Sequence, residues 1–309
     1  MLPENQNEHM SCELFVPKGF RTLAQIDQAN TIIAEYQAEG FTLTLRQLYY
    51  QFVARGLLAE NTLREYKRLG RIVREARDAG LIDWDAIEDR TREVNNHSWW
   101  HSPADIIESA ASSYCEDLWQ GQPYRPEVWI EKDALLGVIE AVCTEFRCPY
   151  FSHRGNCSQT LVYEAGQRFA GQIDHGLLPL VLHLADHDPN GIDMTRDLTK
   201  RFALYARQPI EVRRIALNMD HVERYRPPPN FAKEGDTRTS GYVERFGTEE
   251  CWELDALSPT VIADLVRSEI RPLIDVDCWE EAIANEERGR EQLRAIAETT
   301  RASGGSPSI

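Results

Sequence analysis

Residues 178–193 are Leu178-Pro179-Leu180-Val181-Leu182-His183-Leu184-Ala185-Asp186-His187-Asp188-Pro189-Asn190-Gly191-Ile192-Asp193. The first seven form an apolar run, which predicts a buried strand. Pro189 and Gly191 predict a turn into an amphipathic helix over residues 194–205. Two carboxylates, Asp186 and Asp188, therefore stand where a strand ends. Because open α/β sheets bind ligands at that edge and Mg²⁺ prefers carboxylate oxygens, the pattern indicates a metal site.

An Asp-x-Asp pair taken alone has a simpler structural interpretation. Asp186 could cap the following helix while Asp188 solvates the turn. We expect His187 to face solvent, and for Asp193 we favour a helix cap over a metal ligand. The choice between a turn and a metal site depends on the rest of the chain.

Strands and helices alternate around this stretch. We predict strands at 127–131, 149–152, 178–184 and 210–217, and helices at 134–146, 159–169, 194–205, 259–273 and 279–299, with residues 230–246 as a loop. Such alternation is typical of a mostly parallel sheet covered by helices on both faces. Glu131 ends the first strand, so it is expected to meet Asp186 and Asp188 at one edge. Three carboxylates there would suit Mg²⁺ in phosphodiester chemistry.

The N-terminal part has a different pattern. Helices are predicted at 22–39, at 45–55 after a capping box of Thr44 and Gln47, and at 61–79. Short extended pieces at 81–85 and 89–92 could form a wing. Three helices with a small β element are typical of a winged-helix DNA-binding domain.

The third helix carries a basic stripe. Its residues 64–77 include six positive residues and two glutamates, a local charge of +4 in a chain of −16. Their spacing of three to four places most of them on one helix face, which suits contact with phosphates. The alternative is a solvated helix face without a partner.

Composition limits the class of protein. The 309 residues suit about two domains. The charge of −16 argues against a surface that coats nucleic acid indiscriminately, but local binding stays possible. No apolar run approaches the roughly 20 residues of a membrane span, and we find no secretory signal. Seven scattered cysteines without a Cys-x-x-Cys pair suit a cytoplasmic protein.

The motifs together resemble a known family. The Glu…Asp-x-Asp arrangement resembles the Toprim domain, and residues 129–134, 154–156 and 186–193 are similar to the Toprim of the topoisomerase VI A subunit. Residues 45–50 are similar to the Arg-x-x-Tyr-Tyr motif in that family's winged-helix domain, which the eukaryotic meiotic double-strand-break protein shares. The chain is shorter than a full A subunit, as the standalone Mini-A homologues are.

The resemblance implies a role for several residues. Tyr50 would be the nucleophile and Tyr49 its packing partner, although the apolar spacing of this helix also suits a core tyrosine. Arg46, four residues earlier on the same face, could bind the scissile phosphate. Glu131, Asp186 and Asp188 would hold Mg²⁺. The expected DNA-contacting residues are Arg64, Lys67, Arg68, Arg71, Arg74, Lys132 and Arg154; before Arg154, Ser152 and His153 stand where the family's loop has a glycine.

We therefore expect an α/β protein made of a mainly α winged-helix domain followed by a Toprim-type Rossmann-like domain. The expected parts are a flexible tail (1–20), the winged helix (21–95), a connector with one helix near 104–118 (96–124), the Toprim domain (125–275), and a C-terminal helix with a disordered tail (276–309).

The expected activity is Mg²⁺-dependent cleavage of double-stranded DNA by tyrosine transesterification, which leaves 5′-phosphotyrosyl breaks. The resemblance implies a homodimer in which the tyrosine of one subunit meets the metal of the other. Because the chain lacks a Gly-x-x-x-x-Gly-Lys-Ser/Thr loop, strand passage would need a separate ATPase subunit. Two alternatives stay open: a hydrolytic nuclease that uses the metal site without the tyrosine, and a non-catalytic DNA-binding module.

Overall fold

The computed structural model describes residues 20–58, 60–87, 99–231 and 236–303. Most of the expected N-terminal tail, the second extended piece of the wing (89–92) and the end of the C-terminal tail lie outside these ranges. Within the described ranges, no helix is both long and apolar enough to cross a membrane.

A four-stranded parallel sheet forms the centre of the larger part of the chain. Its strands are β1 (Tyr124–Ile130), β2 (Tyr150–Ser152), β3 (Leu178–Leu184) and β4 (Glu211–Ala216), in the order β2-β1-β3-β4. The register pairs Ile130 with both Ser152 and Leu184. The strand ends are therefore level, and the residues that follow β1 and β3 meet at one edge. The predicted α/β class and parallel sheet are confirmed.

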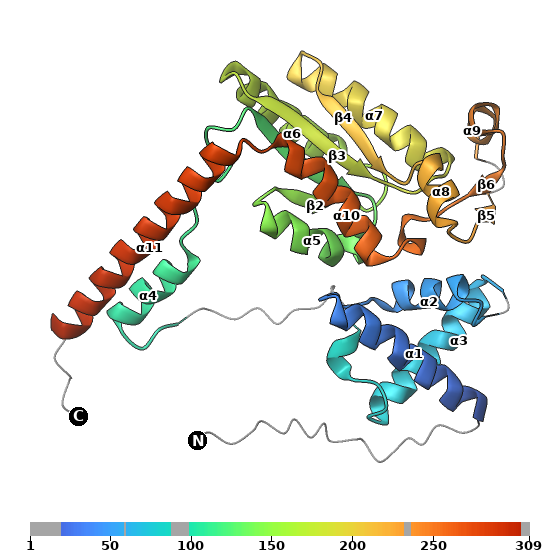
Figure 1. Cartoon of the computed structure of the whole chain (residues 1–309). Helices are drawn as coiled ribbons and strands as arrows, with labels where there is room; N and C mark the ends of the chain where they lie inside the picture. The colour runs from blue at the N-terminus through green and yellow to red at the C-terminus, as the bar shows by residue number, and fades with distance from the viewer. Residues whose placement is uncertain (1–19, 59, 88–98, 232–235, 304–309) are drawn as a thin grey trace.

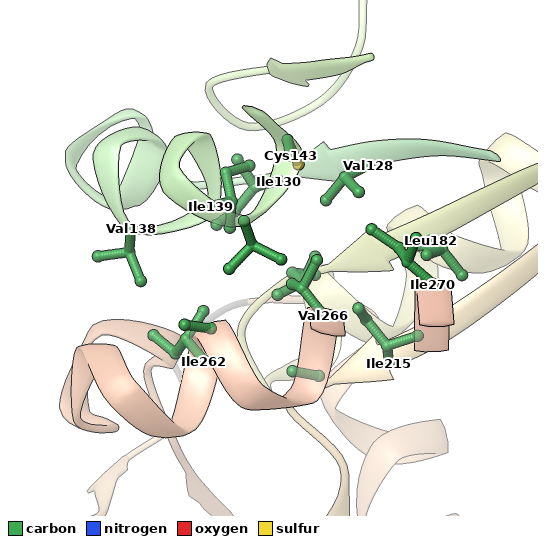
Figure 2. Close-up of a cluster of buried hydrophobic side chains, with 14 of the residues drawn as sticks. Val128, Ile130, Val138, Ile139, Cys143, Leu182, Ile215, Ile262, Val266 and Ile270 are labelled. Atoms are coloured by element: carbon green, nitrogen blue, oxygen red, sulfur yellow. The ribbon is translucent and has the colours of Figure 1, made fainter. Parts of the chain in front are cut away.

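Helices cover both faces of the sheet (Figure 1). Helices α5 (Leu136–Glu145) and α10 (Pro259–Ile270) pack on one face, and α6 (Gln159–Asp174) and α7 (Pro189–Ala206) pack on the other. Figure 2 shows the core between the sheet and helices α5 and α10, where Val128 and Leu182 face Ile139 and Val266. Trp129 belongs to the core on the other face, between the sheet and helices α6 and α7. A strand buried on both faces is apolar over most of its length, which is why the run at 178–184 predicted β3. Its one polar residue, His183, is fully buried beside His153 and Thr195.

The N-terminal helices α1 (Phe20–Ala38), α2 (Leu45–Ala54) and α3 (Leu63–Asp78) enclose a core of their own. The predicted capping box is confirmed, since the Thr44 side chain accepts from the Gln47 amide and the Gln47 side chain accepts from the Thr44 amide. The prediction of an extended piece at 81–85 was wrong, because its last two residues belong to a 3₁₀ turn, η1 (Trp84–Ala86). Ile87, just after this turn, forms a lone parallel bridge with Leu43.

Two helices from distant parts of the sequence pair with each other. Helix α4 (Pro103–Ser113) packs along α11 (Val276–Ser303), and the pair projects away from the sheet (Figure 1). The predicted connector helix is thus present but ends at Ser113. It lies beside the C-terminal helix, from which it is far apart in the sequence.

The segment after β4 is more regular than predicted. It contains α8 (Met219–Tyr225), the small hairpin-like pair β5 (Asn230–Phe231) and β6 (Glu250–Cys251), and α9 (Thr239–Phe246). The prediction of a loop at 230–246 was therefore wrong. Tyr242 is the one residue of α9 that is buried, so the apolar signal was too weak to indicate a helix. Three short 3₁₀ helices complete the fold: η2 (Asp133–Leu135), η3 (Leu254–Ala256) and η4 (Arg271–Leu273).

Candidate functional site

Two of the three predicted metal ligands touch at the carboxyl edge of the sheet. Glu131 follows β1, and its Oε2 accepts a hydrogen bond of 3.0 Å from the backbone amide of Asp186. The Asp186 side chain is buried, with Oδ1 accepting from the Leu254 amide at 2.8 Å. The predicted convergence of Glu131 and Asp186 is present in the structure.

Asp188 lies beside them but acts as the helix cap. It is the N-cap of α7, and its Oδ1 accepts from the Gly191 amide at 2.6 Å. Helix α7 begins at Pro189 rather than at 194. Asp193 is therefore inside the first turns, where it pairs with Arg196 at 2.7 Å. The helix cap is Asp188, so the prediction of Asp193 as a cap was wrong. The alternative in which Asp186 caps the helix and Asp188 solvates the turn was also wrong.

His187 does not face solvent. It is 1% exposed, its Nδ1 lies 2.7 Å from the Tyr242 hydroxyl, and its backbone bridges to Trp252. The contacts of His187 with Tyr242 and Trp252 therefore fix the turn that carries the two aspartates. An apolar environment for this histidine could not be read from the polar residues around it in the sequence.

Lys132 is the centre of an ionic cluster at this edge. Its Nζ lies 2.7 Å from Asp186 Oδ2, 3.1 Å from Glu253 Oε2 and 3.8 Å from Asp255 Oδ1. Glu253 and Asp255 flank the start of η3, and the Asp255 side chain is fully buried. We call Lys132, Asp186, Glu253 and Asp255 the edge cluster.

The predicted tyrosine helix docks on this cluster. Arg46 of α2 lies 2.5 Å from Glu253 Oε2 and, through Nε, 2.8 Å from Asp255 Oδ2. Its guanidinium also lies over the Tyr50 ring, 5.8 Å from the centroid. Tyr50 and Glu253 line the same cavity, and the negative charge of Glu253 contributes to the raised pKa of Tyr50. Residues from three distant segments, 46–50, 131–132 and 253–255, therefore meet at one place.

The carboxylates of this region have shifted pKa values in opposite directions. Burial, and then the negative charge of Asp186, raises the pKa of Glu131 to about 7. Burial also raises the pKa of Asp255 to about 7, although Lys132 and Arg46 oppose it. Burial would raise the pKa of Glu253 as well, but the two cations outweigh it and lower this pKa to about 2. Glu253 is thus the firmly charged partner of both cations.

Tyr50 is held in its phenol form. Only 5% of the residue is exposed, and burial is the largest cause that raises the pKa of its hydroxyl above the ordinary 10. The negative charges of Asp255 and Glu253 raise it further, while Arg46 lowers it. The isolated chain therefore disfavours a phenolate at this position.

The donor types suit Mg²⁺. Glu131, Asp186 and Asp188 supply hard oxygen ligands, and the raised pKa of Glu131 is caused in part by the other two carboxylates, so an added cation would relieve their repulsion. In the described ranges, however, no three His, Cys, Asp or Glu side chains are already grouped as the ligands of a metal. Lys132 and backbone amides use several of the oxygens.

The basic residues predicted to contact DNA fall into two groups. Arg64, Lys67, Arg71 and Arg74 are exposed along α3 and form no ion pair with another described residue. We call these four the α3 stripe. Arg68 differs, because it pairs with Glu65 at 3.1 Å and bonds to Gln25 on α1. Arg154 follows β2 and is largely exposed, but it pairs with Asp133.

Several residues of the site were missed in the sequence. Arg214 on β4 binds the backbone oxygens of Ala185, Asp186 and Gly191, so it fixes the turn that carries the carboxylates. Glu253 and Asp255 are one residue apart, as Asp186 and Asp188 are. This repeated spacing of two acidic residues was the sequence signal that could have identified them. Nothing in their local sequence indicated that Lys132 and Arg46 would be their partners.

A cavity of about 250 Å³ opens beside Tyr50. It lies where the N-terminal helices meet the rest of the chain, and it is lined by Arg46, Tyr49, Tyr50, Asn61, Thr62, Leu63, Tyr66, Asn230 and Glu253. The buried tyrosine thus borders a space that a ligand could enter.

No protein-family model matches the sequence, and a search of curated proteins gives no match. The function is therefore argued from the residues and their geometry.

Proposed function

We propose that this protein cleaves DNA, with Tyr50 as nucleophile and with a winged-helix part followed by a Toprim-type part. One observation carries the proposal: Arg46 and Tyr50 on α2 meet the edge cluster, which adjoins Glu131 and Asp188. These are the two motifs on which the resemblance to the topoisomerase VI A subunit rests, and they are more than 80 residues apart in the sequence.

The chain's own groups suit attack on a phosphodiester. The Tyr50 oxygen would bond to phosphorus while the bond from phosphorus to the 3′ oxygen breaks, leaving a 5′-phosphotyrosyl link. Glu253, which lines the same cavity as Tyr50, would accept the phenolic proton, and the released 3′ oxygen would take up a proton from water. Arg46 could exchange its carboxylate partners for the phosphate, which it can bind through two N–H groups.

Glu131, Asp186 and Asp188 would hold Mg²⁺. When bound there, the metal would polarise a phosphate oxygen and balance the developing charge. Lys132, which now pairs with Asp186, would keep the remaining carboxylates neutralised. The α3 stripe would bind the DNA backbone.

Hydrolysis without the tyrosine is the second candidate. The raised pKa of Tyr50, caused by burial and by two adjacent carboxylates, favours it. A homodimer and a separate ATPase partner belong to the proposal as the resemblance implies them.

Incubation with supercoiled plasmid and Mg²⁺, followed by denaturing gels run with and without protease, tests the proposal. We expect breaks that carry covalently linked protein, no cleavage by Tyr50→Phe, and none by Glu131→Ala or Asp186→Ala. Tyr163→Ala on α6, a half-exposed tyrosine outside the site, is the matched control. Free ends with an active Tyr50→Phe variant would establish hydrolysis, and DNA binding without any cleavage would contradict both activities.

A further inference from the structure

The cavity beside Tyr50 has an aromatic wall. Tyr49 and Tyr50 contact edge to face with ring centroids 5.6 Å apart, and Tyr66 of α3 contacts Tyr49 in the same way at 5.3 Å. The Tyr49 hydroxyl is fixed by hydrogen bonds to Asn61 Oδ1 at 2.9 Å and to the Thr62 backbone oxygen at 3.1 Å. The wall is therefore preorganised. Tyr49 and Tyr50 are nearly buried, so Tyr66, which is partly exposed, is the ring of this wall that is available for stacking. Aromatic rings stack on nucleobases with little regard to sequence.

The lining of the cavity also includes polar side chains. Asn61 donates to Asn230 Oδ1 at 2.8 Å, and Asn230 in turn lies 3.3 Å from Glu253 Oε1. Amide and carboxylate groups of this kind can exchange these bonds for those of a base edge. An aromatic wall with a few convergent polar groups, at the junction of two parts of a chain, is the usual character of a ligand site.

Size and charge indicate which ligand fits. Drug-sized ligands occupy cavities of roughly 300 Å³ or more, so a cavity of about 250 Å³ suits a single nucleobase and its sugar rather than a base pair. Leu63 and Tyr66 line it, and the α3 stripe begins between them at Arg64. A polyanionic strand that follows the stripe is thus led to the cavity.

We propose that this cavity binds one unstacked nucleotide of a DNA strand, adjacent to the phosphate that Arg46 engages. The choice of DNA rests on the proposed function, whereas the fit for a nucleobase rests on the cavity itself. The substrate class that follows is DNA with an unpaired or easily unpaired base at the cleavage point. Fully stacked duplex would have to release a base to enter.

The test is equilibrium binding in EDTA, so that no cleavage occurs. The probe is a DNA duplex with a one-nucleotide bulge of 2-aminopurine, compared with the fully paired duplex. Because stacking is worth about 1–3 kcal/mol per base, we expect the wild type to bind the bulged duplex roughly tenfold more tightly. Tyr66→Ala should abolish this preference and Tyr66→Phe should retain it.

The controls separate the cavity from general DNA binding and from catalysis. Tyr163→Ala should keep the preference, and Asn230→Ala supplies a second cavity variant if Tyr66→Ala does not fold. Equal binding of both duplexes by the wild type, or a preference that survives both cavity variants, would overturn the inference. So would a bulged RNA or a free mononucleotide that competes equally well. If Tyr50→Phe still cleaves while the preference holds, only the proposed function fails.

Discussion

Gly191 is required because a side chain there would strike the turn that carries the carboxylates. A Cβ atom at this position would lie 2.1 Å from the backbone oxygen of Asp186. Overpacking of this kind costs about 1–3 kcal/mol. We expect Gly191→Ala to lower the free energy of unfolding by about that amount in urea titrations, and to weaken cleavage because Asp186 is displaced. Gly171→Ala in α6 is the matched control, since a Cβ there would meet no side chain and no backbone beyond its own helix within 4 Å; equal effects of the two would contradict this role.

Asp255 should make stability depend on pH. Its pKa is about 7 in the folded chain against an ordinary 3.8, mainly through burial; Asp186 and Glu253 add to this rise, and Lys132 and Arg46 oppose it. A carboxyl whose pKa is raised by folding is destabilised as it loses its proton, so its contribution worsens as the pH rises from about 4 to about 7. One pKa unit corresponds to about 1.4 kcal/mol, which gives about 3–4 kcal/mol over this range.

The variant Asp255→Asn cannot titrate at this position. We therefore expect the free energy of unfolding of the variant minus that of the wild type, measured in urea at each pH, to increase between pH 4 and pH 7. Glu131 is raised in the same sense and remains in both proteins, so the difference isolates Asp255. If the free energies of unfolding of the two proteins changed with pH in parallel, Asp255 would have its ordinary pKa in the folded chain.

At the scale of single elements, α3 should supply most of the electrostatic attraction for DNA. Each phosphate contact contributes about −0.9 to the slope of log K against log salt. Replacing Lys67 and Arg71 by Ala should lower the steepness of that slope by about 2 and weaken binding to all sequences alike. Lys200→Ala, an exposed lysine on α7, should leave it unchanged. An unchanged slope for the α3 variant would place the DNA elsewhere.

Elements with a continuous or periodic apolar pattern could be predicted closely from the sequence. Strand β3 has the predicted bounds because both of its faces are buried, and α2 begins where its capping box indicated. Helix α9 was missed because only Tyr242 is buried in it.

The carboxylates could be predicted because strand ends have a fixed place in a parallel sheet. The partners of Glu253 and Asp255 could not, since ion pairs between distant segments leave no periodic pattern. The alternative that made Asp186 the helix cap failed for a related reason: which of two aspartates caps a helix depends on where its first turn starts, and α7 starts directly after Asp188.

At the scale of the whole molecule, the two parts of the chain are joined at the candidate site itself. Ala256 of η3 is buried in the core of the N-terminal helices, and Phe41 packs against both that core and the core of the sheet. Arg46 adds two ion pairs to the same junction. The tyrosine helix is therefore positioned against the carboxylates of its own chain, whereas the resemblance implied a site shared between subunits.

Co-expression of Tyr50→Phe chains with Asp186→Ala chains distinguishes these arrangements. If each chain uses its own tyrosine and carboxylates, every site in a mixed dimer lacks one component. If the tyrosine of one subunit works with the carboxylates of the other, one site of the mixed dimer is complete and should nick one strand. From the ion pairs of Arg46 we expect no cleavage by the mixture, measured as conversion of supercoiled to nicked plasmid. Co-expression of wild-type with Tyr50→Phe chains, which should nick, is the control, and nicking by the doubly defective mixture would show that the tyrosine acts across the dimer.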